Sequence, residues 1–220
     1  HRRRRSADCC PKGYRRMMLY SAPNPAPNPR RVKIYLAEKG LSVPVTELSL
    51  VKREHKAPEF VEKNGRGQVP ALELDDGTVI SESFAICRYF EALHPDPPLF
   101  GRSALEIATI DMWLRRVEMV LMPPVGAVWV HTHPLTARLP MPRRSDWGED
   151  NRPRAVDALR WFDGELAGHD FVAGDGYSVA DIALLTTVDF AGFIGIAMPD
   201  DAANLRAWHA RVSARPSATA

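Results

Sequence analysis

The chain has 220 residues, of which 45% are hydrophobic and 25% charged, and its formal net charge at pH 7 is +2. This composition is typical of a globular protein and not of a disordered chain, and no apolar run approaches the ~20 residues that a membrane-spanning helix needs. Residues 1–16 carry a net charge of +6, which leaves −4 for residues 17–220. An acidic body argues against a nucleic-acid-binding protein.

Residues 1–16 differ from the rest of the chain. They begin with His, have no apolar periodicity and contain no hydrophobic segment like that of a secretory signal. We therefore expect a disordered extension ahead of the fold. Cys9 and Cys10 lie in this extension, whereas Cys87 belongs to the body. A single body cysteine excludes a disulfide framework there and favours a reducing cytoplasm as the location.

The first part of the body alternates between strand and helix. Residues 17–21 have the pattern of a short strand, and residues 43–48 alternate well enough for a second one. Between them, a Pro-rich loop leads into a helix. Asn28 is a suitable N-cap for this helix, Pro29 a suitable first residue and Gly40 a suitable residue just past its end.

The stretch at residues 65–83 is the most informative part of the sequence. Pro70 follows two glycines and opens a short apolar strand, where its missing N–H is tolerated. The turn at residues 75–77 joins this strand to a second one that ends at Ile80. A helix is then expected at residues 82–94. Its apolar side chains recur at helical spacing and predict a buried face: Phe84, Cys87, Phe90 and Leu93.

Beyond residue 94 the patterns are helical. A stiff, Pro-rich linker is expected at residues 95–103, and a long helix at residues 104–122 is expected to stop at Pro123-Pro124. Residues 134–151 contain three prolines and read as a loop. The remaining helical segments are expected at residues 125–130, 152–166, 178–187 and 203–212. The segment that begins at Ser178 opens with the spacing of a capping box, with Asp181 as its acidic partner.

Two of these motifs together resemble the cytosolic glutathione S-transferases, of a bacterial type. In that family a Val–cis-Pro element, followed by a Glu/Gln-Ser pair, holds glutathione, and Val69-Pro70 and Glu82-Ser83 occupy this pattern here. A capping box like the one at residues 178–181 lies in the helical domain of the family. The resemblance covers roughly residues 18–213.

The resemblance implies a fold with two domains. The first is an α/β thioredoxin-like N-terminal domain (βαβ-ββα) at residues 17–94. The linker at residues 95–103 connects it to an all-α helical-bundle C-terminal domain at residues 104–220.

The resemblance also implies how glutathione binds. Val69, ahead of Pro70, would pair its backbone with the cysteinyl part of the tripeptide, like an added strand. Ser83 and the helix N-terminus would bind the γ-glutamyl carboxylate, and Glu82 would face the γ-glutamyl ammonium. Plain helix capping is the alternative role for Glu82 and Ser83.

Three polar residues are candidates for the glycyl end of glutathione. Lys56 or His55 resembles the basic position that meets the glycine carboxylate in the family, and Gln68 is expected to assist. For the two basic residues, the alternative is an ordinary solvated loop charge.

The thiol-activating residue departs from the family pattern. Where several classes keep a Ser, this chain has Ala26 or Pro27, neither of which has a side-chain donor. Asn28 is the first candidate for donating to the thiolate, and Ser21 is the second; backbone N–H groups at the helix start can share this role. The alternatives are a plain N-cap for Asn28 and a turn hydroxyl for Ser21.

Apolar side chains of the helical half are candidates for the electrophile pocket. Met119, Met122 and Trp129 have helical or near-helical spacing, and they either line such a pocket or belong to the core. His131 and His133 alternate without a third ligand nearby, which makes a poor metal site, so no metal is expected.

Several functions are compatible with this plan. The leading one is a cytoplasmic, homodimeric glutathione transferase that detoxifies by conjugating glutathione, as co-substrate, to an apolar electrophile. A thiol reductase needs a Cys within residues 20–31, and an isomerase of the maleylacetoacetate type needs a Ser-Ser-Cys loop; both are absent. The remaining alternative is a non-catalytic or weakly catalytic glutathione-binding protein of the same fold.

Overall fold

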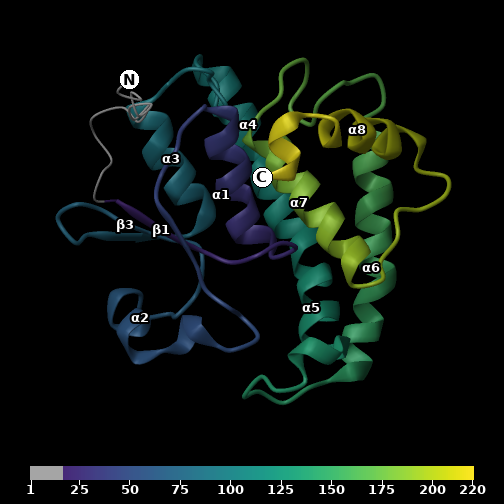
Figure 1. The fold of residues 1–220 in the computed structure, drawn as a ribbon. Coiled ribbons are helices and arrows are strands. Elements are labelled where there is room, and N and C mark those ends of the chain that lie inside the picture. The colour runs from purple at the N-terminus through teal and green to yellow at the C-terminus, as the bar shows by residue number, and fades with distance from the viewer. Residues whose placement is uncertain (1–16) are drawn as a thin grey trace, which may run out of the picture.

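The computed structural model describes residues 17–220, so the extension expected at residues 1–16 lies outside the described residues (Figure 1). The chain begins with a four-stranded mixed sheet in the order β2-β1-β3-β4. Its strands are β1 (Met18–Ser21), β2 (Val45–Glu47), β3 (Ala71–Glu73) and β4 (Val79–Ser81). Strand β1 pairs in parallel with β2 and antiparallel with β3, and β3 forms a hairpin with β4.

Helices cover both faces of this sheet. The helices α1 (Pro27–Glu38) and α3 (Ser83–Leu93) pack side by side on one face, and the short α2 (Pro58–Lys63) lies on the other (Figure 1). A 3-10 turn, Glu54–Lys56, precedes α2. The order of elements confirms the predicted βαβ-ββα plan of a thioredoxin-like domain.

The second domain is helical. Its elements are α4 (Ala104–Arg116), α5 (Met122–Thr132), α6 (Ser145–Glu165), α7 (Val179–Phe193) and α8 (Ala203–Ser213), with 3-10 turns at Pro134–Thr136 and Pro216–Thr219. Helix α7 is almost entirely buried and packs against α1 of the first domain. The predicted all-α C-terminal bundle is thereby confirmed. None of the helices in the described residues is long and apolar enough to cross a membrane.

The prediction that Pro123-Pro124 ends a helix is wrong. The helical chain continues through a π-helical turn, Val117–Leu121, and directly into α5. A π-turn interrupts the regular bonding ladder, and the two prolines then occupy the first turn of α5, where their missing N–H groups need no acceptor. The prolines therefore mark a junction and not a stop.

Other helix boundaries also differ from the predictions. Helix α6 begins at Ser145 within the expected loop and includes Pro153, and α7 continues past Thr187 to Phe193. The long contact between α5 and α6 holds this proline inside a helix that local preference would end. Leu93, predicted to be buried, is 47% exposed at the end of α3.

The capping box at the start of α7 is confirmed and is larger than predicted. The Asp181 carboxylate accepts from the backbone N–H groups of Val172 and Ser178, both at 2.9 Å, and from the indole N–H of Trp208 at 2.9 Å. Asp181 has no exposed surface. One buried carboxylate thus joins α7 to the preceding loop and to α8, and fixes the position of the helix that contacts α1.

Candidate functional site

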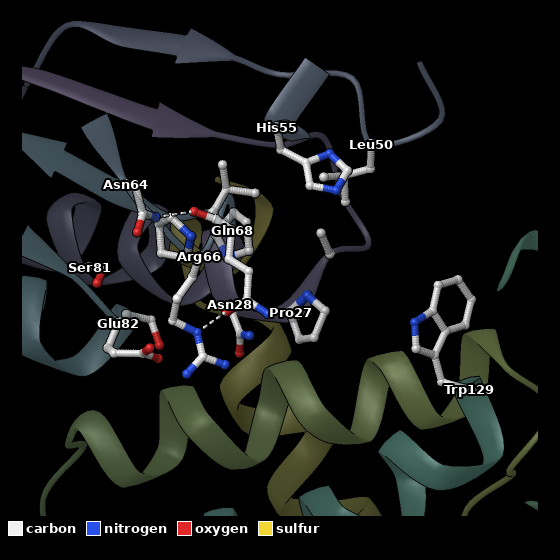
Figure 2. Close-up of a pocket in the computed structure, with 15 residues that line it drawn as sticks. Pro27, Asn28, Leu50, His55, Asn64, Arg66, Gln68, Ser81, Glu82 and Trp129 are labelled. Atoms are coloured by element: carbon white, nitrogen blue, oxygen red, sulfur yellow. Dashed lines mark hydrogen bonds between the residues drawn. The ribbon is translucent and has the colours of Figure 1, made fainter. Parts of the chain in front are cut away.

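A pocket of about 290 Å³ opens where the edge of the first domain faces α5 (Figure 2). Its walls come from the start of α1, the loop before β3, and the turn between β4 and α3, at residues 26–29, 64, 66, 68–70 and 81–83. Leu50, His55 and Trp129 complete the lining. The size is close to the lower limit of small-molecule sites.

Val69 lies at the centre of this wall with its backbone open. The Val69-Pro70 peptide bond is cis, as the resemblance implies. Among the described contacts, neither the N–H nor the C=O of Val69 has a hydrogen-bond partner, while the neighbouring Gln68 carbonyl accepts from Asn64 Nδ2 at 2.7 Å. A partly exposed residue with both backbone groups open can pair with an extended peptide, as an added strand would.

Glu82 and Ser83 lie at the turn into α3. Glu82 has φ 71° and ψ 122°, a conformation that costs a non-glycine residue about 1–3 kcal/mol and is most often kept at functional sites. Ser83 is the first residue of α3, and no side chain caps this helix. Glu82 and Ser83 therefore do not act as capping side chains for α3, the alternative role considered for this pair. Their carboxylate and hydroxyl have no protein partner among the described hydrogen bonds and line the pocket beside a helix N-terminus.

The basic group that lines this pocket is not the first one expected. Lys56 is not among the lining residues, and its ammonium donates to the Arg66 carbonyl at 2.9 Å. Arg66 and His55 do line the pocket, and Arg66 Nε donates to Gln68 Oε1 at 2.9 Å. Sequence reasoning missed Arg66, because side-chain direction in an irregular loop leaves no periodic pattern.

His55 is a weak source of positive charge here. Burial, with added repulsion from Lys56 and Arg53, lowers the pKa of its imidazole below the usual 6.5. A neutral ring at pH 7 leaves Arg66 as the cation that faces the pocket from this loop. Gly67 lets the two segments meet, because a Cβ on it would lie 2.7 Å from the His55 carbonyl oxygen.

The start of α1 differs from the prediction. The helix begins at Pro27, with Ala26 as the N-cap, and Asn28 lies within the first turn. Pro27 and Pro29 have no N–H, so this helix start needs no capping side chain. The backbone N–H of Asn28 has no acceptor among the described backbone contacts, while Arg30 N–H bonds to the Ala26 carbonyl at 3.3 Å.

The side chain of Asn28 lines the pocket and is oriented from behind. Arg31 Nη1 donates to Asn28 Oδ1 at 2.8 Å. A guanidinium only donates, so the amide atom that faces it is the oxygen, and Nδ2 is the end without a protein partner. Asn28 thus offers the pocket two donors, its Nδ2 and its backbone N–H.

The second catalytic candidate, Ser21, lies elsewhere. It is fully buried at the end of β1, is not part of the pocket lining, and its hydroxyl has no hydrogen-bond partner in the described residues. The adjacent Tyr20 hydroxyl donates to Glu73 at 2.7 Å and is also absent from the lining.

Of the three candidates for an electrophile pocket, Trp129 is the one brought to this site. Met119 is 74% exposed and outside the lining. Met122 is partly buried behind α1, where its sulfur accepts from Arg31 Nη2 at 2.9 Å. Trp129 reaches the mouth of the pocket from α5 (Figure 2).

Aromatic side chains surround Trp129. Its ring centroid lies 4.6 Å from that of His133, 5.2 Å from that of Phe190 and 6.3 Å from that of Phe193. The two phenylalanines lie on α7 and were missed by the sequence analysis, because their distance in sequence from Trp129 hides the cluster. Phe193 is 45% exposed, so an apolar surface lies beside the pocket mouth.

The neighbouring histidines are used in backbone contacts. His131 Nδ1 accepts from the N–H of Arg144 at 3.2 Å, and His133 Nδ1 accepts from that of Leu135 at 3.3 Å. Within residues 17–220, no group of three or more His, Cys, Asp or Glu side chains is gathered as it would be around a metal ion.

Comparison with protein families gives two matches. Residues 26–93 match the model of the glutathione S-transferase N-terminal domain, and residues 136–216 match that of the glutathione S-transferase C-terminal domain. Among curated proteins, glutathione S-transferase 2 of Saccharomyces cerevisiae is 40% identical over 205 residues, covering 92% of this chain and 88% of the relative. Glutathione S-transferase F9 of Arabidopsis thaliana is 28% identical over 194 residues, covering 86% of this chain and 89% of the relative.

Solved structures agree with these matches. The structure of Gtt2 from Saccharomyces cerevisiae has a TM-score of 0.86 at 40% identity, covering 92% of this chain and 98% of that one. A glutathione S-transferase of class Gtt2 from Vibrio parahaemolyticus has a TM-score of 0.79 at 32% identity, covering 91% of this chain and 94% of that one.

Proposed function

Because this chain belongs to the glutathione S-transferase family and is a glutathione transferase, we propose that it joins the sulfur of glutathione to an apolar electrophile that carries an aromatic ring. The observation that carries this proposal is the open set of polar groups on one pocket wall. The backbone groups of Val69 and the side chains of Glu82 and Ser83 have no protein partner among the described hydrogen bonds, and these residues line the same pocket as Asn28.

Glutathione would lie along this wall in an extended form. Its cysteinyl backbone pairs with the N–H and C=O of Val69, the residue just before the cis bond to Pro70. The γ-glutamyl carboxylate binds the Ser83 hydroxyl and the start of α3, where the helix dipole is positive, and the γ-glutamyl ammonium faces Glu82.

The glycyl end of glutathione would lie beside the loop before β3. Its carboxylate faces the Arg66 guanidinium, which Gln68 holds through a hydrogen bond of 2.9 Å. Lys56 contributes through its bond to the Arg66 carbonyl, by holding this loop in place.

In this pose the thiol lies at the start of α1. The thiol proton leaves to solvent, and the thiolate accepts hydrogen bonds from Asn28 Nδ2 and the Asn28 backbone N–H. The sulfur then forms a bond to an electrophilic carbon. In substitution the leaving group departs with its bonding electrons, and in addition the carbanion formed takes a proton from water.

The electrophile would lie against Trp129. This indole, with Phe190 and Phe193 behind it, presents an apolar and aromatic surface next to the thiol position. Met122 does not line this pocket; its sulfur accepts from Arg31 Nη2.

The proposal is tested by glutathione-affinity retention combined with a conjugation assay on an aryl halide. We expect retention and turnover, a fall in kcat of ~10–100-fold for Asn28→Ala, and unchanged glutathione affinity for Trp129→Ala with a raised KM for the aryl halide. If Asn28→Ala leaves turnover unchanged, the assignment of Asn28 is wrong.

A second candidate function follows from the residues at 22–29, which contain no Ser, Thr, Tyr or Cys. Without a hydroxyl or thiol donor, the fold would bind glutathione with little or no catalysis. Retention without turnover on any electrophile tested would favour this binding protein over the transferase reaction.

We also propose that the enzyme acts as a homodimer in the cytoplasm. A stripe of exposed apolar side chains along α4 and the following π-turn supports an association surface: Leu105, Met112 and Met119. Sedimentation equilibrium would test this, and a monomer at micromolar concentration would contradict it.

A further inference from the structure

Arg31 of α1 is a buried cation without an anionic partner. Its side chain is among the largest fully buried ones of the described residues, and none of the ion pairs described involves it. Its neighbour Arg30 is different, since it pairs with the Asp189 carboxylate at 2.5 Å. Removing a charge from water costs several kcal/mol unless an opposite charge compensates it, so an unpaired buried guanidinium requires a reason.

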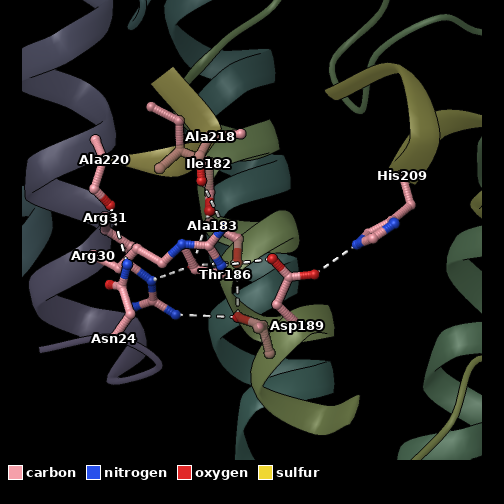
Figure 3. A network of polar contacts seen from close by, with 11 residues as sticks. Asn24, Arg30, Arg31, Ile182, Ala183, Thr186, Asp189, His209, Ala218 and Ala220 are labelled. Atoms are coloured by element: carbon pink, nitrogen blue, oxygen red, sulfur yellow. Dashed lines mark hydrogen bonds and ion pairs between the residues drawn. The ribbon is translucent and has the colours of Figure 1, made fainter. Parts of the chain in front are cut away.

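The partners of Arg31 are neutral, and two of them lie on α7, opposite α1 (Figure 3). Nε donates to Thr186 Oγ1 and Nη2 to Thr187 Oγ1, both at 3.1 Å. The Thr186 hydroxyl donates in turn to the carbonyls of Ile182 and Ala183 on α7. Each threonine proton is therefore committed to the helix, and each oxygen is left to accept from Arg31.

The remaining contacts complete the cage around the guanidinium. Nη2 also contacts the Met122 sulfur at 2.9 Å, and the guanidinium carbon lies 5.0 Å from the centroid of the Phe84 ring. Nη1 donates to Asn28 Oδ1 at 2.8 Å. Asn28 is the partner in this set that also lines the pocket, so the cation lies one side chain away from it.

The acidic groups around Arg31 do not neutralise it. Glu118 on the π-turn attracts Arg31 from a distance and acts against the effect of burial on the Arg31 pKa, but its carboxylate forms its ion pair with Arg115, at 2.6 Å. Asp189 on α7 pairs with Arg30. The Cys87 thiol on α3 is fully buried, and burial raises its pKa, which keeps it protonated. Burial lowers the pKa of Arg31 itself to about 10, so the guanidinium still carries its charge at neutral pH.

We propose that Arg31 is the positioning residue of the thiol site, because it holds the Asn28 amide with Nδ2 toward the pocket. The thiolate of bound glutathione is then the counter-ion that Arg31 otherwise lacks, and the charge of Arg31 stabilises that thiolate. This inference rests on the proposed function. A neutral amide is a modest donor, but one whose oxygen is bound to a cation is polarised and donates more strongly.

The experiment measures the pKa of the thiol of bound glutathione, from the ultraviolet absorbance of the thiolate. In the wild type we expect this pKa below the ~8.5 of an ordinary thiol. Arg31→Met should raise it by ~1–2 units and lower kcat at neutral pH by ~10–100-fold, because charge and donor position are lost together. Binding of S-methylglutathione, which has no thiol to ionise, should stay within ~3-fold of the wild type.

Arg30→Met is the matched control. It removes the same charge one residue away, where a carboxylate already compensates it, and it should leave the bound-thiol pKa within ~0.5 unit of the wild type. A general loss of structure would weaken S-methylglutathione binding as well, and so is separated from the proposed effect.

Asn28→Asp keeps the test decisive if Arg31→Met does not fold. It places a carboxylate against the guanidinium and supplies the counter-ion from the protein, whereas Asn28→Ala removes the donor and leaves the cation unpaired. The bound-thiol pKa should rise by at least ~1 unit more in Asn28→Asp than in Asn28→Ala, and Asn28→Asp should be the more heat-stable of the two.

Equal thiol pKa values in the two Asn28 variants, or a shift below ~0.5 unit in a folded Arg31→Met, would overturn the inference. In either case a low thiol pKa and turnover in the wild type would leave the proposed function intact. A wild type that binds glutathione without lowering its thiol pKa would overturn both.

Discussion

The two ends of the pocket are built in different ways. The tripeptide end, residues 68–70 and 81–83, comes from consecutive elements of one domain. The backbone groups of Val69 and the side chains of Glu82 and Ser83 have no protein partners there among the described hydrogen bonds. The thiol end, Asn28 with Arg31, is held by side chains of α7 in the other domain.

Under the proposed function, this difference separates the recognition of glutathione from the reactivity of its thiol. The tripeptide end can bind a peptide backbone through groups that the loop before β3 and the start of α3 provide locally. The thiol end depends on how the two domains pack, since Arg31 is oriented by Thr186 and Thr187 across the interface. Changes in the helical domain should therefore alter the thiol chemistry more than the affinity for glutathione.

The largest effect is expected from breaking the support of α7. Asp181→Ala leaves three buried donors, on Val172, Ser178 and Trp208, without their acceptor. We expect a loss of ~3–5 kcal/mol in the free energy of unfolding, measured by urea denaturation.

Asp170→Ala is the control for that experiment. The Asp170 carboxylate pairs with Arg211 at 2.9 Å but is 68% exposed, so its removal should cost below ~1 kcal/mol. Similar losses in the two variants would contradict the role given to the Asp181 network.

The tripeptide end is tested by Ser83→Ala. Loss of a hydrogen bond to a charged carboxylate should weaken glutathione binding by ~10–100-fold in calorimetry, with the pKa of the bound thiol unchanged. Ser81→Ala removes a hydroxyl from the same wall, two residues away, and should change affinity by ~2-fold at most. A shifted thiol pKa in Ser83→Ala would mean that the two ends are not separable.

The contact between the C-terminal end of α1 and residues 215–217 should also respond to acid. The Glu38 carboxylate on α1 accepts from Arg215 Nε at 2.8 Å and Nη2 at 2.7 Å, and from the Ser217 hydroxyl. Burial alone would raise the pKa of Glu38, but these bonds outweigh it and hold the pKa below the usual 4.5.

A lowered folded-state pKa means that this stabilisation is present above about pH 4.5 and is lost as the pH falls through the folded value. Glu38→Gln should be less stable than the wild type at pH 7 by on the order of 1 kcal/mol. The two unfolding curves should converge at acidic pH, and a gap that persists at low pH would contradict the ionic origin.

The smallest effect is expected at the rim of the tripeptide end. Arg66→Met removes an exposed cation from the lining and should raise the KM for glutathione by ~2–5-fold at low salt, with less effect at high salt. Lys52→Met removes an exposed charge outside the lining and should leave the KM unchanged. If the rise in KM for Arg66→Met is the same at low and high salt, the prediction of a solvent-exposed ionic contact between Arg66 and glutathione is wrong.

Much of the first domain could be predicted from local pattern. The hairpin of β3 and β4 and the helix that follows it were readable, because turn residues and apolar spacing act over a few positions. The capping box of Ser178 and Asp181 was readable for the same reason. Family resemblance then pointed to the tripeptide end, where the structure gathers the residues expected.

The errors lie where tertiary contacts override local preference. Proline usually breaks a helix, yet Pro123 and Pro124 follow a π-turn at the start of α5. Pro153 lies inside α6, which packs against α5. Arg66 was missed and Lys56 was expected in its place, because alternation and periodicity say nothing about side-chain direction in a loop.

The amino-acid sequence by itself determined the order of elements, the family and the wall proposed to bind glutathione, since these depend on short-range spacing and backbone preference. Only the tertiary structure decided what surrounds the thiol. Two threonines of α7 and one methionine of α5 meet Arg31 across the domain interface and leave its charge unpaired behind Asn28. The dielectric environment of a charge is set by everything packed around it, and that is a property of the folded chain alone.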